Sequence, residues 1–143
     1  MLLGLILLGT CGLIAELLLL GHTESFSQWI PLISLAAGLV ATIAVWLRPG
    51  STTIGAFRII MFVFVAAGLL GVYFHFAGNI EWALERDPEL SGLHLIWKAL
   101  KGATPSLAPG ALAQLGLLGL IFAWTQPDAQ GSSSHNSSTG DRK

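Results

Sequence analysis

The chain has little cysteine and little charge. Cys11 is the one cysteine among 143 residues, which excludes an intrachain disulfide and a metal site built from several cysteines. Charged residues make up 10% of the chain, whereas soluble domains carry about 25%. The seven Lys and Arg residues are scattered and the formal net charge is −1. The composition therefore disfavours a soluble globule, and it shows no basic surface of the kind that binds nucleic acid.

Sequence motifs of common enzyme classes are also absent. There is no His-Glu-x-x-His run, no Glu-x-x-His pair and no phosphate-binding glycine loop. A nucleophile elbow of the Gly-x-Ser-x-Gly type is missing as well. The sequence therefore names no cofactor, and it favours a protein that is not an enzyme.

Long hydrophobic runs are what the chain does contain. Hydrophobic residues make up 53% of it and its mean hydropathy is +0.71. Four apolar segments each approach the roughly 20 residues that a helix needs to cross a bilayer. They cover residues 2–20, 30–47, 54–76 and 107–125. We therefore predict an all-α, polytopic membrane protein: one four-transmembrane-helix bundle over residues 1–126, its first helix uncleaved.

Helix-capping residues refine two of these segments. Pro31 is expected in the first turn of the second helix, where its missing amide hydrogen does no harm, and Arg48-Pro49-Gly50 ends that helix. Ser106 is the expected N-cap of the fourth helix, because it places Pro109 in the first turn.

The long connection between the third and fourth segments carries an amphipathic pattern. Asp87 is an expected N-cap followed by Pro88 in the first turn, which predicts a helix over about 88–101. Its apolar residues recur at spacings of three and four: Leu90, Leu93, Trp97 and Leu100. This helix is too short to span a membrane, so we expect it at the interface. It either rests on the headgroups or covers the outer mouth of the bundle. Residues 127–143 are polar and Ser-rich, which predicts a disordered tail.

The basic residues indicate an orientation. Arg48 and Arg58 lie beside one end of the bundle, and the tail ends in Arg142 and Lys143, whereas the first connection, 21–29, has no Lys or Arg. This bias places both termini in the cytoplasm, in a bacterial inner membrane. The bias is incomplete, because the long outer connection also carries basic residues: Arg86, Lys98 and Lys101.

Glu16 is the most informative single residue, because a carboxylate at membrane depth is costly and marks a functional hypothesis. Gly9, Gly12 and Glu16 share a narrow helical face, and small residues let helices approach closely, so this face is expected to point into the bundle. Comparable sets occur on the other three helices: Ser34, Gly38 and Thr42; Ala67, Gly71 and His75; Gly116, Gly119 and Ala123.

Most polar residues are expected at one end of the bundle, and they form the candidate site. It comprises Glu16, His22, Glu24, His75, Asn79 and Glu81. A metal could be held by a related set: His22, Glu24, His75, Glu81 and Glu85. Structural interpretations stay open beside these. Glu16 could be protonated and donate to a backbone carbonyl or to Gln114, the other intramembrane polar residue, which we interpret as a contact between helices.

Three stretches together resemble a family of small bacterial four-helix membrane proteins with no known activity. They run from Glu16 to Pro31, from His75 to Glu81 and from Gly102 to Gly110. The resemblance implies an inner-membrane protein with four helices and supplies no mechanism.

We therefore favour a non-enzymatic subunit or accessory factor that binds a partner or ligand at its outer face. The expected partners are the lipid bilayer and another membrane protein or a second copy of the chain, and no nucleic acid. One alternative is a small proton-coupled transporter with Glu16 as its proton-binding group. The other is a metal-dependent membrane enzyme that uses the histidines and carboxylates listed above.

Overall fold

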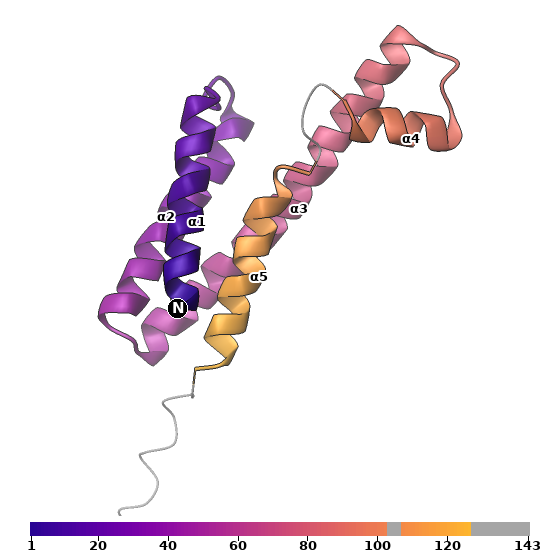
Figure 1. Cartoon of the computed structure of the whole chain (residues 1–143). Coiled ribbons are helices and arrows are strands. Elements are labelled where there is room, and N and C mark those ends of the chain that lie inside the picture. Colours follow the sequence, from indigo (N-terminus) through magenta and orange to yellow (C-terminus); the bar gives the residue numbers. More distant parts are fainter. Residues whose placement is uncertain (103–106, 127–143) are drawn as a thin grey trace, which may run out of the picture.

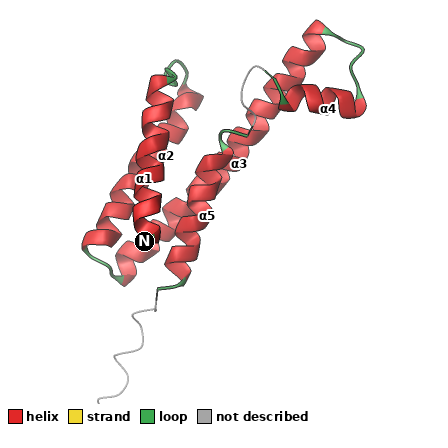
Figure 2. Cartoon of the chain, in the orientation of Figure 1, coloured by secondary structure: helices red, strands yellow, loops and turns green. Residues whose placement is uncertain are grey.

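The computed structural model describes residues 1–102 and 107–126, with only the backbone of Ser27, and Figures 1 and 2 show that these residues form helices joined by short loops. The helices of those ranges are α1 (Leu2–Leu19), α2 (Phe26–Leu47), α3 (Ser51–Arg86), α4 (Gly92–Leu100) and α5 (Gly110–Trp124). The all-α prediction is confirmed. Three helices, α1, α2 and α3, are long and apolar enough to span a membrane, which is consistent with an integral membrane protein. The predicted disordered tail lies outside the described residues.

A tight turn joins α1 to α2. Gly21 adopts a left-handed conformation with φ +64, and His22 N donates to Leu17 O over 2.9 Å, the pattern of a glycine-terminated helix. Gln28 then accepts hydrogen bonds from the backbone of Glu24 (2.7 Å) and Ser25 (3.2 Å). These bonds start α2 at Phe26 rather than at residue 30. The prediction that Pro31 lies in the first turn was therefore wrong, since it lies inside the helix.

Helix α3 is longer than the predicted span of 54–76. It has 36 residues and ends at Arg86, with Asp87 as its C-cap, because Pro88 disfavours a helical conformation at the residue before it. Asp87 therefore ends one helix instead of starting the next, and α4 begins later than predicted, after Ser91. At 1.5 Å per residue α3 is about 54 Å long. That exceeds the roughly 30 Å of a hydrocarbon core, so α3 projects beyond it.

Helix α5 is shorter than the predicted 107–125. It has 15 residues, begins at Gly110 with Pro109 as its N-cap, and follows a turn at residues 107–109. The predicted cap Ser106 lies outside the described residues.

Small residues bring the long helices together around α3. A Cβ added to Gly68 would lie 2.5 Å from the backbone N of Ala113, and one added to Gly116 would lie 2.7 Å from the carbonyl O of Met61. Gly38 is in similarly close contact with the ring of Phe64. Because only glycine permits such approaches, α5 and α2 pack directly on α3. Helix α1 contacts α2 and α5, whereas α4 contacts α3 alone among the described helices.

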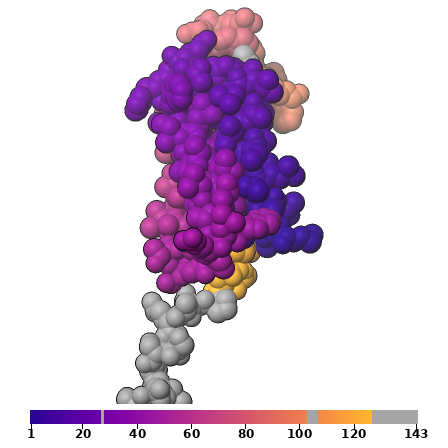
Figure 3. Space-filling model, turned by 90° about the vertical axis from the view of Figure 1, so that its left-hand side faces the viewer, coloured from indigo at the N-terminus to yellow at the C-terminus, as the bar shows by residue number. Residues whose placement is uncertain are grey.

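The outer surface of these helices is apolar. Large hydrophobic side chains are exposed on α1, α2, α3 and α5, for example Leu8, Val40, Leu69 and Ile121. Figure 3 shows α1 and α2, in indigo and purple, side by side along one face of the molecule. Such a surface is suited to contact with lipid chains.

Candidate functional site

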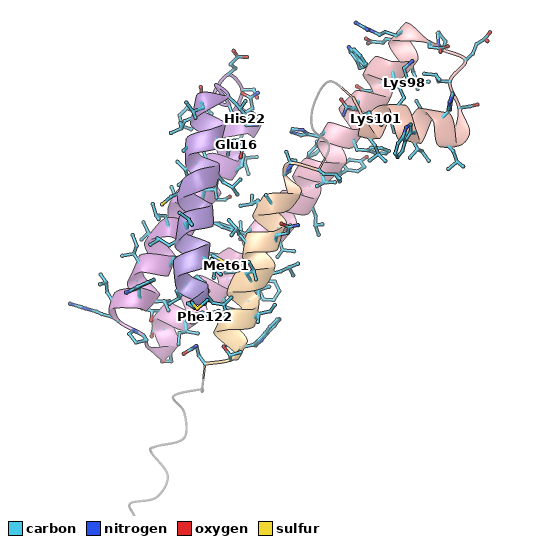
Figure 4. All side chains as sticks on the ribbon, viewed as in Figure 1. Glu16, His22, Met61, Lys98, Lys101 and Phe122 are labelled. Atoms are coloured by element: carbon cyan, nitrogen blue, oxygen red, sulfur yellow. The ribbon has the colours of Figure 1, made fainter. Side chains whose placement is uncertain are left out.

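The structure divides the predicted polar cluster into two groups. Glu16, His22 and Glu24 lie at one end of the α1–α2 hairpin, where Glu16 and Glu24 are exposed and His22 is half-buried. Figure 4 shows Glu16 and His22 there, well separated from Lys98 and Lys101 beside α4. Helix α4 contacts neither α1 nor α2, and Figure 1 shows the outer part of α3, which carries α4, lying away from the turn between α1 and α2.

The second group lies on the outer part of α3. His75 is half-buried, Asn79 is 2% exposed, and Glu81 and Glu85 are exposed. Nδ1 of His75 is buried without a hydrogen-bond partner among the described residues. No three His, Cys, Asp or Glu side chains in residues 1–102 and 107–126 are grouped closely enough to hold a metal ion. The structure therefore does not assemble the predicted metal-ligand set.

Asn79 attaches α4 to α3. Its side-chain Nδ2 donates to the backbone O of Ala99 over 3.0 Å in a buried hydrogen bond. Gly102 packs directly against the same side chain, and Ala83 and Ala99 are both fully buried. Because a buried amide without a partner is costly, this contact fixes where α4 lies. The role of Asn79 in this contact is structural.

Glu16 lies on the outer surface of α1, so the prediction that it faces the bundle was wrong. The packed side of α1 is formed by Ile6, Thr10, Leu13 and Leu17, and Glu16 is roughly 90° away around the helix. Its carboxylate has no hydrogen bond or ion pair with any described residue. Gly12 is exposed beside it, and nothing lies within 4 Å of an added Cβ. Of the predicted stripe, only Gly9 is packed, against Leu115.

Gln114 is exposed too, on α5. Its neighbours Ala113 and Leu115 face the core, whereas Gln114 shares the outer side with Leu117 and Ile121. Glu16 and Gln114 therefore both point away from the core of this chain. An interaction of Glu16 with Gln114, which the sequence left open, is not formed.

Arg58 has a role that the sequence analysis missed. It is half-buried on α3, and one guanidinium nitrogen, Nη2, donates to the carbonyl O of Ala123 in the last turn of α5, over 3.2 Å. A cation at a helix C-terminus is favourable, because the free carbonyls there carry partial negative charge. The sequence showed Arg58 only as an orienting charge, because the helix end that it contacts belongs to another helix and lies 65 residues later in the chain.

Comparisons with protein-family models, with curated proteins and with solved structures gave no match to this chain. Any function must therefore be argued from the side chains themselves.

Proposed function

We propose that the chain is a non-enzymatic subunit of a membrane complex, and that the exposed face of α1 binds a transmembrane helix of another chain. The observation that carries this proposal is Glu16: a carboxyl group within an apolar span, exposed and without a partner among the described residues. The sequence predicted partner binding at the outer face of the bundle, which is the end directed away from the cytoplasm. The proposal now places it along α1.

The depth of the Glu16 carboxyl group in the membrane determines how costly it is without a partner. Helical side chains tilt toward the helix N-terminus, so the Glu16 side chain points away from the nearby end of α1 at Leu19 and deeper into the span. A carboxylate there costs about 2.5–3.5 kcal/mol or more if lipid surrounds it. A hydrogen bond to a neighbouring helix in the membrane contributes about 0.6–2 kcal/mol. A partner helix with a donor or acceptor would reduce the cost of placing Glu16 in lipid.

The residues around Glu16 favour close contact with a helix. Cys11, Gly12 and Ala15 are small and exposed, and they share the outer side of α1 with Glu16. Small residues allow two helix backbones to approach closely, which strengthens van der Waals packing in lipid. This surface can accept a helix without any rearrangement of α1.

The proposal includes a topology of four spans. Helix α5 is about 22 Å long by its 15 residues, shorter than a typical hydrocarbon core, but it packs along α3 and beside α1. Local thinning of the bilayer would let a helix of this length cross it, and the turn at residues 107–109 would add to its length. We further propose a bacterial inner membrane with both termini in the cytoplasm, on the basis of Arg48 and Arg58. In this topology α4 is an interfacial helix on the outer side.

The test is recovery of the complex from native membranes in mild detergent. Glu16→Leu removes the hydrogen-bonding group, and we expect roughly a 3- to 30-fold loss of association, as befits one interhelical hydrogen bond. Glu16→Gln keeps a polar group of the same size and should retain most association. Glu24→Leu is the matched control, because Glu24 is an exposed carboxylate outside the span. Equal recovery of the wild-type chain and Glu16→Leu, or recovery of the wild type only as a monomer, would contradict the proposal.

The same variants separate this function from the transporter alternative. A proton carrier predicts that Glu16→Gln abolishes pH-dependent flux in liposomes. A subunit predicts that Glu16→Gln leaves the complex intact. The position of Glu16 on the outside of the bundle favours the subunit, because a carrier that works alone needs its proton-binding group on an internal path.

A further inference from the structure

Helix α4 has three distinct sides, and one of them contacts α3. Ala99 is fully buried, Leu95 is half-buried, and the carbonyl of Ala99 accepts the hydrogen bond from Asn79. At about 100° per residue, Leu95 and Ala99 lie within roughly 40° of each other. This side holds α4 against the outer part of α3, and Figure 1 shows α4 beside that part of α3.

A second side of α4 is apolar and exposed. Leu93 is 84% exposed, Ile96 44%, Trp97 58% and Leu100 40%. By the same geometry these residues lie about 60–160° around the helix from Ala99. Because α4 contacts no described helix besides α3, no other described helix covers their exposed parts.

The third side of α4 is basic. His94, Lys98 and Lys101 are exposed and lie about 200–260° around the helix from Ala99. Nζ of Lys101 lies 4.6 Å from the centroid of the Trp97 ring, so this lysine is held at the border between the basic and apolar sides.

The acidic residues of α3 lie away from this surface. Glu81 and Glu85 are roughly 200–240° around α3 from Asn79, which contacts α4. They therefore point to the far side of α3. The exposed part of α4 has a positive charge next to an apolar stripe, a combination that is complementary to an anionic membrane surface.

The position of α4 along α3 agrees with a location at the membrane surface. Asn79 lies roughly 42 Å along the axis of α3 from Ser51, at 1.5 Å per residue. A bilayer with its headgroups is about 40–45 Å thick. If α3 enters the membrane after Arg48, the contact between α3 and α4 lies at the level of the opposite headgroups.

We propose that the membrane leaflet covers α4: its apolar side lies at the boundary with the acyl chains, and Lys98 and Lys101 bind the phosphates of anionic phospholipids. The inference rests on the topology under the proposed function, but not on the partner-binding face of α1. Of the two arrangements that the sequence left open, α4 then rests on the headgroups and does not cover the outer mouth of the bundle.

Quenching of a fluorescent label on α4 in the full-length chain tests the contact with lipid. In a Cys11→Ser background, Leu93→Cys or His94→Cys carries a fluorescent label in phosphatidylcholine vesicles containing phosphatidylglycerol. We expect lipid-bound quenchers to act several-fold more strongly on the label at Leu93, and aqueous iodide to act more strongly on the label at His94. Equal quenching by iodide at both positions would overturn the placement of α4 on the membrane.

Lipid retention tests the binding of phosphate. Native mass spectrometry of the full-length chain gives its apparent affinity for phosphatidylglycerol. We expect this affinity to fall about fivefold for each lysine replaced in Lys98→Gln and Lys101→Gln. Arg48→Gln, which removes an exposed cation at the other end of the spans, should change it much less. Unchanged affinity in the lysine variants would overturn phosphate binding. Glu16→Leu should weaken the partner complex without changing the quenching of a label at position 93. A failure of the subunit proposal can therefore be told apart from a failure of the lipid-contact proposal.

Discussion

Gly68→Ala is the sharpest test of how α3 and α5 pack. An added Cβ would lie 2.5 Å from the backbone N of Ala113 and 2.8 Å from its Cβ. Carbon atoms in favourable contact are about 3.5–4.0 Å apart, so the two helices would have to separate by roughly 1 Å. The obstacle is backbone, which cannot rotate aside. Overpacking of this kind costs about 1–3 kcal/mol.

Gly55→Ala is the matched control on the same helix, because nothing lies within 4 Å of a Cβ at that position. Alanine gains helix propensity over glycine at both positions, by up to about 1 kcal/mol, and this gain cancels in the comparison. Gly68→Ala should therefore be less stable than Gly55→Ala by about 1–3 kcal/mol.

The assay is unfolding of the purified protein in mixed micelles with rising dodecyl sulfate, followed by tryptophan fluorescence and circular dichroism. If the two alanine variants unfold at the same detergent composition, α3 and α5 do not approach each other as described. The argument that glycine is required at position 68 would then fail.

Two further predictions concern single side-chain hydrogen bonds. Asn79→Ala removes the bond to the Ala99 carbonyl, so opening of α4 should cost about 1–3 kcal/mol less. Amide hydrogen exchange in α4 should therefore become faster. Glu81→Ala, on the far side of α3, is the control and should leave the exchange of α4 unchanged. Arg58→Met removes the bond to the last turn of α5 and should lower the free energy of unfolding by about 0.5–2 kcal/mol. The control is Arg48→Met at an exposed position, which should cost less than half as much. Equal losses for the two variants in dodecyl sulfate unfolding would contradict the capping role of Arg58.

Local patterns were enough to predict much of the fold. The apolar runs indicated helices where α1, α2, α3 and the shorter α5 lie, and the spacing of small residues correctly indicated close packing at Gly38, Gly116 and Gly119. Both signals are contained within one helix: hydropathy reports its surroundings, and a missing side chain permits close approach of a neighbour.

The candidate site could not be predicted in the same way. Helical periodicity correctly placed Glu16 beside Gly12, but it does not say which side of α1 packs, and the core formed on the side of Ile6 and Leu17. Asn79 was included in the candidate site because its bonding partner, Ala99, lies 20 residues later, and the spacing of residues within one helix gives no sign of that contact.

The extent of α3 was underestimated for a related reason. Hydropathy falls after residue 76, which suggested an end to the helix. The helix continues instead because Ala83 and Asn79 are buried where α4 packs. Tertiary packing of this kind cannot be read from the composition of the segment.

The continuity of α3 has a mechanical consequence. One unbroken helix of about 54 Å joins the packed core around Met61 to the place where α4 is attached. A tilt of about 10° around its inner end would displace the other end sideways by roughly 9 Å. Since α4 is fixed to that end and to nothing else described, α4 must move with it. A change in bilayer thickness that alters the tilt of α3 would therefore be converted into a movement of α4 relative to the membrane surface.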